Sequence, residues 1–183
     1  MNADRTLREA QGQFLRANGL PADGGEHARA WNCRIGPVIL TLPNFAWRKR
    51  AIVRHDLHHV ITGYECGLVG EFEMAAWEFA AGRFDNFFAT AFCLPLVTLG
   101  AVAAPRRTFA AFMRGRGSET LYRSSIDRKL LDMPLRAARQ RFAPQARQPR
   151  AADRIAFLLL TAQGASILVA PLLFSLIALF LGL

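Results

Sequence analysis

The apolar positions of this chain recur mostly at the spacing of an α-helix. Between Gly70 and Ala81 they stand three and four residues apart, and Gly82 follows, which predicts a helix that ends there. The same pattern predicts further helices over residues 6–18, 45–62 and 118–142. Because helical periodicity dominates, we expect an all-α fold built as a compact helical domain.

Three segments are less regular than these helices. Residues 21–37 hold several Gly and Pro residues and are expected to form a loop. Residues 38–42 are a short apolar run that fits either a strand or the start of a helix. The helix over 118–142 is expected to break near Pro134, because proline cannot continue a helix.

Two long runs contain no charged residue. The run from Ile155 to Leu183 has 29 residues, whereas a bilayer core needs only about 20 apolar residues as helix. We therefore expect a transmembrane helix at 155–183; the alternative, a buried core helix, usually keeps a polar face. The run 86–104 has 19 residues and contains Pro95 and Gly100, which favours a core or membrane-dipping helix pair.

The net charge of +9 comes from one part of the chain. Residues 1–104 carry ten basic and ten acidic residues, whereas residues 105–154 carry thirteen basic and four acidic ones. Basic residues before a membrane span favour the cytoplasmic side and attract anionic lipids, and no nucleic-acid-binding motif accompanies them. The chain thus divides into a helical domain (1–143), a basic linker (144–154) and a transmembrane helix (155–183).

Composition also indicates a compartment. Twenty-one arginines against two lysines are typical of a GC-rich bacterial genome, so we expect a bacterial inner membrane with the domain on its cytoplasmic face. Cys33, Cys66 and Cys93 are odd in number and form no CxxC pair, which argues against a disulfide framework. The N-terminus has no apolar signal core.

The chemistry of the chain is concentrated in one short segment, His55 to His59, and in Glu71. On a helix, His55 and His59 stand one turn apart on one face with Asp56 beside them, so both imidazoles can bind one ion. Glu71, in the first turn of the next predicted helix, can point at the same ion. Two nitrogens and two oxygens suit a divalent metal, Zn²⁺ first and Fe²⁺ second. The alternative is an ordinary structural histidine pair.

The neighbouring polar residues are assigned lesser roles. His58 points about 60° away from His55 on the helix and is expected beside the ligand set or at the surface. Glu78, two turns after Glu71, can line the same groove, and Glu65 is expected to be solvated. The HxxHH pattern also matches one histidine box of a di-iron hydroxylase, but such an enzyme needs several boxes and the chain has only one other histidine, His27. An HD phosphohydrolase would use the His55-Asp56 pair but would leave His59 and Glu71 without a role. Neither class of enzyme is therefore favoured.

The spaced motif resembles the coenzyme Q biosynthesis protein 4 family, whose signature is HDxxH, eleven residues, then Glu. Here the signature runs from His55 to His59 and ends at Glu71. Arg54 before it and Val60-Ile61-Thr62-Gly63 after it are similar to the family as well. A weaker likeness covers residues 5–143; the apolar segment 155–183 departs from the family, whose members are peripheral.

The resemblance implies an all-α domain that binds a divalent metal, usually taken as zinc, through His55, Asp56, His59 and Glu71, which would also be the catalytic residues. It implies a role in ubiquinone biosynthesis: oxidative decarboxylation of the carboxyl-bearing ring carbon of a prenylated aromatic acid, by a decarboxylase/hydroxylase or lyase. The expected partners are a membrane lipid or polyprenyl-tailed quinone precursor and other quinone-biosynthesis proteins. The alternative is a non-catalytic, lipid-binding scaffold that organises such proteins.

Overall fold

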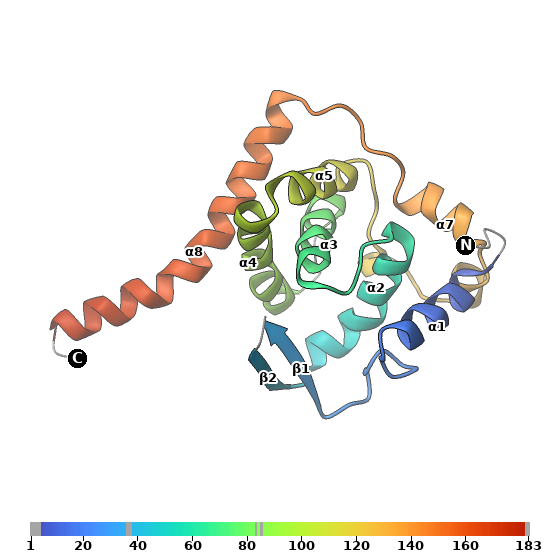
Figure 1. The fold of residues 1–183 in the computed structure, drawn as a ribbon, viewed down its shortest axis with the longest axis horizontal. Coiled ribbons are helices and arrows are strands. Elements are labelled where there is room, and N and C mark those ends of the chain that lie inside the picture. Colours follow the sequence, from blue (N-terminus) through green and yellow to red (C-terminus); the bar gives the residue numbers. More distant parts are fainter. Residues whose placement is uncertain (1–4, 36–37, 83, 85, 182–183) are drawn as a thin grey trace.

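The computed structural model describes residues 5–35, 38–82, 84 and 86–181, and within them the chain is mostly helical (Figure 1). The longer helices are α1 (Leu7–Ala17), α2 (Ala46–Thr62), α3 (Leu68–Ala81), α4 (Phe87–Ala103), α5 (Pro105–Gly115), α7 (Leu135–Phe142) and α8 (Ala151–Leu181). The shorter elements are the strands β1 (Ala30–Ile35) and β2 (Val38–Pro43), the 3-10 helix η1 (Leu121–Arg123) and α6 (Arg128–Leu131). The prediction of an all-α fold is confirmed.

Helix α3 lies at the centre of the domain, with α2, α4 and α5 around it (Figure 1). The side chains of Met74 and Trp77 are fully buried. Two glycines let the neighbouring helices approach closely. A Cβ on Gly100 of α4 would lie 2.6 Å from the Cβ of Phe72, and one on Gly115 of α5 would lie 2.5 Å from the Trp77 carbonyl oxygen. This close packing holds α3 in place as one wall of the histidine cluster.

Helix α2 carries the histidine cluster and ends where the sequence predicts. Gly63 adopts φ +80°, and its N–H donates to the carbonyl of His59, which ends α2 at Thr62. Helix α1, which lies against α2, begins with a capping box in which Thr6 and Glu9 each bind the other's backbone N–H.

The structure corrects the prediction of a loop over residues 21–37. Residues Ala30–Ile35 form β1, which pairs antiparallel with β2 from Ala30 opposite Pro43 to Ile35 opposite Val38. Of the two structures predicted for the run 38–42, a strand or the start of a helix, the strand is therefore the one that forms. The two segments are short and close in sequence, and each satisfies the other's backbone hydrogen-bonding groups.

The chain after α3 also differs from the prediction. Residues 86–104 form one helix rather than a pair, because α3 and α8 support α4 on both sides of Pro95. Helix α5 was not predicted; it starts at Pro105, a residue suited to the first helical position. The helix expected over 118–142 is divided into η1, α6 and α7, with Asp127 capping α6 and Pro134 directly before α7.

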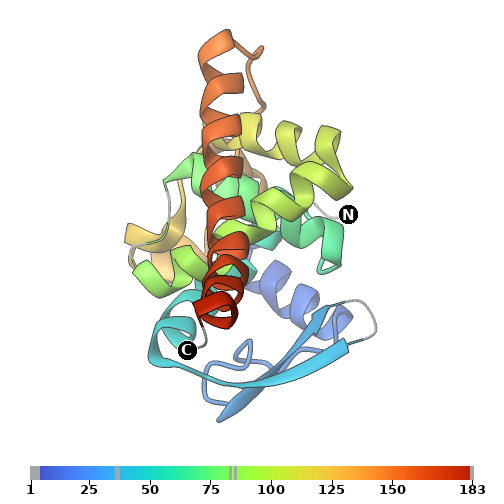
Figure 2. The same cartoon turned by 90° about the vertical axis from the view of Figure 1, so that its left-hand side faces the viewer.

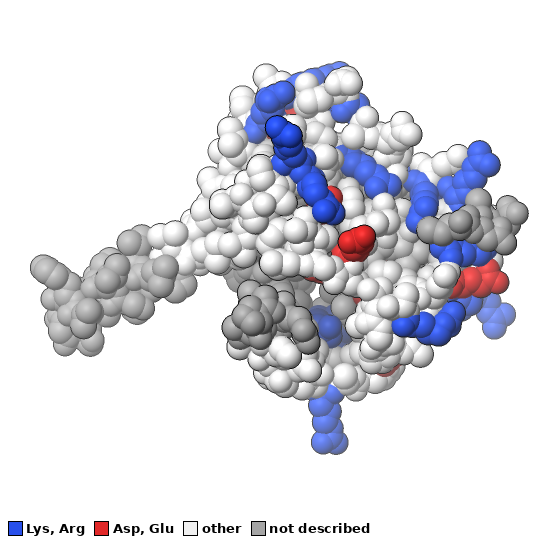
Figure 3. All heavy atoms as spheres, in the orientation of Figure 1, with Lys and Arg blue, Asp and Glu red and all other residues white. Residues whose placement is uncertain are grey.

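Helix α8 begins at Ala151, slightly before the uncharged run. Its first turn is tied to the domain because the buried carboxylate of Asp153 accepts hydrogen bonds from Arg116 and Arg147. Figure 2 shows α8 running along the domain before its last turns project beyond it in Figure 1. Among the described residues one helix is long and apolar enough to cross a membrane, α8 over Ala151–Ala170. In Figure 3 the basic side chains lie over the body of the domain, and some of them lie at the start of α8, where Arg116 and Arg147 bind Asp153.

We expect Gly164→Val to weaken the packing of α8 against α4. A Cβ at Gly164 would lie 2.4 Å from the Thr98 hydroxyl oxygen and 2.5 Å from the Leu94 carbonyl oxygen, a backbone atom that cannot rotate aside. Overpacking of this kind costs about 1–3 kcal/mol, which should lower the thermal unfolding midpoint of the detergent-solubilised chain. Ser166→Val is the control, since Ser166 is exposed on the same helix; equal shifts in both variants would contradict the prediction.

Candidate metal centre

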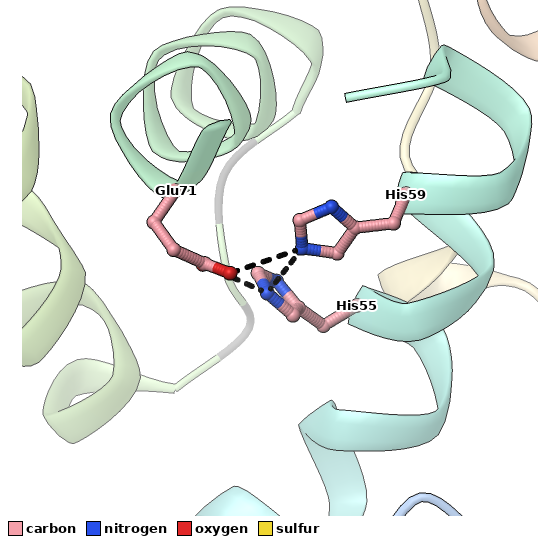
Figure 4. A group of neighbouring side chains, drawn as sticks. All are labelled: His55, His59 and Glu71. Carbon is pink, nitrogen blue, oxygen red and sulfur yellow. Dashed lines mark hydrogen bonds and ion pairs between the residues drawn. The ribbon is translucent and has the colours of Figure 1, made fainter. Parts of the chain in front are cut away.

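Helices α2 and α3 bring His55, His59 and Glu71 together (Figure 4). The Nε2 atoms of His55 and His59 are 3.1 Å apart. The Oε2 atom of Glu71 lies 3.3 Å from His55 Nε2, and its Oε1 atom lies 3.4 Å from His59 Nε2. Three of the four predicted ligands therefore point toward one position between the two helices.

The other ring nitrogen of each histidine already has a partner. The Nδ1 of His55 lies 3.1 Å from Oε1 of Glu78, and the Nδ1 of His59 lies 2.9 Å from the carbonyl oxygen of Tyr64. A carboxylate and a carbonyl can only accept hydrogen bonds, so each Nδ1 carries the hydrogen and donates it. In the neutral ring, each Nε2 is then left with a free lone pair.

Two lone pairs that face each other at 3.1 Å repel unless a positive charge lies between them. A proton on one Nε2 can be shared with the other in an N–H···N hydrogen bond, whereas a metal ion binds both nitrogens and the Glu71 carboxylate as well. In a tetrahedral zinc site with bonds of about 2.0–2.1 Å, neighbouring ligand atoms stand about 3.3–3.4 Å apart. The separations of 3.1, 3.3 and 3.4 Å, of which the last two involve different oxygens of Glu71, are close to that value, and these residues fit a divalent metal such as Zn²⁺ or Fe²⁺.

Glu78 is a fully buried carboxylate behind the two candidate ligands His55 and His59. Its Oε1 accepts hydrogen bonds from Nδ1 of His55 at 3.1 Å, Nδ1 of His58 at 2.7 Å and the Tyr122 hydroxyl at 2.7 Å. Burial alone would raise the pKa of Glu78, but the charge of His55 and the hydrogen bonds from His55 and His58 lower it to about 2. A carboxylate that binds a ligand histidine fixes the ring and strengthens the metal bond.

His58 is buried and takes no part in the ligand group. Its Nδ1 donates to Glu78, its Nε2 accepts the backbone N–H of Leu121 at 2.8 Å, and its ring packs against Trp77 and Tyr122. Both ring nitrogens are therefore in use. The prediction that His58 lies at the surface is therefore wrong. His58 instead links α2 to η1 and to the buried carboxylate of Glu78.

Asp56, the fourth predicted ligand, lies beside the group without joining it. Its carboxylate lies against Gly24, where an added Cβ would meet Oδ2 at 2.3 Å. The residue is 3% exposed, and Oδ2 has no hydrogen-bond partner among the described residues. Burial raises the pKa of Asp56 to about 6, although the charges of His55 and His59 oppose the rise. The site therefore contains a buried carboxyl group that can change protonation near neutral pH.

The ligand group is open toward solvent on one side. The Glu71 side chain is 34% exposed, whereas that of His59 is 1% exposed. A pocket of about 300 Å³ also adjoins His59, and the exposed residue Glu65 is part of its lining. Structural zinc sites are closed by four protein ligands, and catalytic sites keep one position open. Three converging ligands and an exposed carboxylate resemble the open kind.

Two parts of this arrangement were not predicted from the sequence. The Tyr64 carbonyl orients His59, and a backbone oxygen has no sequence signature. Glu78 was expected only to line the groove, although its spacing from Glu71 places both acids on the same face of α3. Their position on one face of α3 was the feature of the sequence from which a second carboxylate behind His55 and His59 could have been predicted.

Comparison of the chain with protein-family models, with curated proteins and with solved structures gives no match. The resemblance of the His55–His59 and Glu71 motif to the coenzyme Q biosynthesis protein 4 family stays a prediction.

Proposed function

We infer that the chain is a metal-dependent, membrane-anchored enzyme of ubiquinone (prenylquinone) biosynthesis. The observation that carries this inference is the convergence of two histidine Nε2 atoms and the Glu71 carboxylate on one open position. The spaced motif supports the pathway by its resemblance to the coenzyme Q biosynthesis protein 4 family. The apolar helix α8 supports the location, since a polyprenyl-tailed precursor is confined to a membrane.

The proposed reaction is oxidative decarboxylation of a prenylated aromatic acid. The ring–carboxyl bond breaks and releases CO₂, a hydroxyl group takes its place with water as the oxygen source, and two electrons pass to a quinone or dioxygen acceptor. His55, His59 and Glu71 would hold the ion, which supplies a Lewis acid for negative charge on the substrate oxygens.

The remaining residues of the site would position groups or move protons. Glu78 holds the ring of His55 so that its Nε2 faces the open position. Asp56, whose pKa is raised to about 6, can take up or release a proton beside that position at neutral pH. The proposed setting is the cytoplasmic face of a bacterial inner membrane.

A lipid-binding scaffold is the second candidate function. The ligand group links α2 to α3, so a bound ion would also fix the two helices relative to each other. In a scaffold, the metal would be needed for folding and for presenting the lipid to other quinone-biosynthesis proteins, and no chemistry would depend on it.

Glu71→Gln separates these two functions. The amide keeps the shape of the side chain but removes the charge, so we expect metal binding to be lost and product formation to fall at least about 100-fold, with helix content and membrane retention unchanged. Metal content of the purified chain, circular dichroism, and quinones and precursors in the producing cells are measured separately. Glu65→Gln is the matched control, since Glu65 is an exposed acid close by. Full product without bound metal would refute the enzyme, and unfolding of Glu71→Gln would favour the scaffold.

A further inference from the structure

Helices α4 and α8 run side by side in opposite directions. The Thr98 hydroxyl donates to the Thr161 carbonyl at 2.7 Å, and Gly164 lies against Leu94. At the start of α8, Phe157 packs against α5, which follows the C-terminal end of α4. The N-terminal end of α4 is therefore level with the part of α8 that leaves the domain, as Figures 1 and 2 both show.

That end of α4 exposes a group of large apolar side chains. Phe87 is 76% exposed, Phe88 is 63% exposed and Phe92 is 41% exposed. The ring of Phe92 contacts Trp31 of β1 and Trp47 of α2, which extends the surface onto the strand pair. The aromatic end of the domain is defined by these residues and by Leu40 of β2, which is on the same face of the strand pair as Trp31: Trp31, Leu40, Trp47, Phe87, Phe88 and Phe92. An exposed group of this kind marks an interaction surface.

The length of α8 indicates how deeply the aromatic end of the domain reaches into a bilayer. The helix is about 46 Å long at 1.5 Å per residue, which exceeds a hydrocarbon core of about 30 Å. The part from Gly164 to Leu181 alone measures about 27 Å, so α8 can enter the bilayer where it leaves α4. From Leu94 back to Phe87, α4 extends about 10 Å farther in the same direction.

We propose that the aromatic end of the domain is a membrane-docking surface whose occupant is the lipid bilayer around α8. Exposed apolar side chains of α8, such as Ile167 and Val169, follow Gly164 in the part of the helix that leaves α4 at this same end. Tryptophan beside an apolar surface is typical of the membrane–water interface, and the Arg48 guanidinium lies 4.3 Å over the Trp31 ring. The surface thus holds the domain against the membrane in one orientation. The inference rests on α8 as the anchor and is independent of the metal chemistry.

Two positions on α4 test this docking in the full-length chain. Phe87→Trp places a reporter at the aromatic end, and Val102→Trp places one at the opposite end, where Val102 is 80% exposed. The variants are reconstituted into phosphatidylcholine vesicles with or without bromine on the acyl chains, and quenching is measured as the difference from the parent protein. We expect several-fold stronger quenching at position 87 than at position 102.

Two outcomes would overturn the proposal. Equal quenching at both positions would mean that the aromatic end has no special depth in the bilayer. No lipid quenching at position 87, together with a fluorescence shift that depends on protein concentration, would mean that a second copy of the chain covers the surface. Circular dichroism of both variants ensures that each is folded, and retained metal binding shows that the ligand group is unaffected.

Discussion

Glu78→Ala is expected to unfold the helical domain under conditions in which the parent chain is folded. The carboxylate accepts hydrogen bonds from His55, His58 and Tyr122 at a position with no solvent exposure. A buried donor without a partner costs about 1–3 kcal/mol, so three lost bonds should remove about 3–9 kcal/mol from the free energy of unfolding. Most domains have only about 5–15 kcal/mol in total. Chemical denaturation of the detergent-solubilised chain measures the loss.

Glu78→Gln is expected to keep the fold and weaken the metal site. The amide oxygen can replace Oε1 as the shared acceptor. The amide nitrogen would take the place of Oε2, which has no partner among the described residues, at a cost of about 1–3 kcal/mol that is smaller than the loss in Glu78→Ala. Loss of the charge makes His55 a poorer ligand, and substitutions behind a metal ligand typically cost about 10–100-fold in affinity. Glu119→Gln, at an exposed position, is the control. Parental metal affinity in Glu78→Gln would contradict this role of Glu78.

The convergence of His55, His59 and Glu71 was predictable because it depends on local geometry. Helical spacing alone places His55 and His59 one turn apart, and a short connector limits where Glu71 can lie. Asp56 shows the limit of this reasoning, since its place next to His55 in the sequence says nothing about the loop at Gly24 that its carboxylate faces. The contacts behind the ligands depend on tertiary packing and were missed for that reason.

The fold was predictable to a similar degree. Long periodic segments such as α2, α3 and α8 lie close to their predicted ranges. The errors fall where a neighbour decides the structure: β1 is a strand because β2 pairs with it, and α4 continues through Pro95 because α3 and α8 pack against it. The break of 118–142 into short pieces follows from Asp127 as a cap and from the contact of His58 with Leu121.

Metal binding at neutral pH is expected to release a proton from His55. Burial favours the neutral ring, but the charge of Glu78 and the hydrogen bonds with Glu71 and Glu78 outweigh it and raise the pKa of His55 well above its ordinary value. The metal-free protein therefore carries His55 as the cation at neutral pH, and the Nε2 must lose its hydrogen before it can bind a metal. Below the raised pKa, metal affinity should fall about tenfold for each unit of decreasing pH.

Calorimetric titration of the metal-free chain with Zn²⁺ measures this proton directly. Two buffers with different ionisation enthalpies at the same pH should give different apparent heats, and their difference should correspond to about one proton released for each ion bound. Glu78→Gln removes the charge that raises the pKa of His55, so less proton release and a weaker dependence of affinity on pH are expected in that variant. Identical heats in both buffers for the parent chain would show that His55 is already neutral before the metal binds. The prediction that His55 is protonated in the metal-free chain would then be wrong.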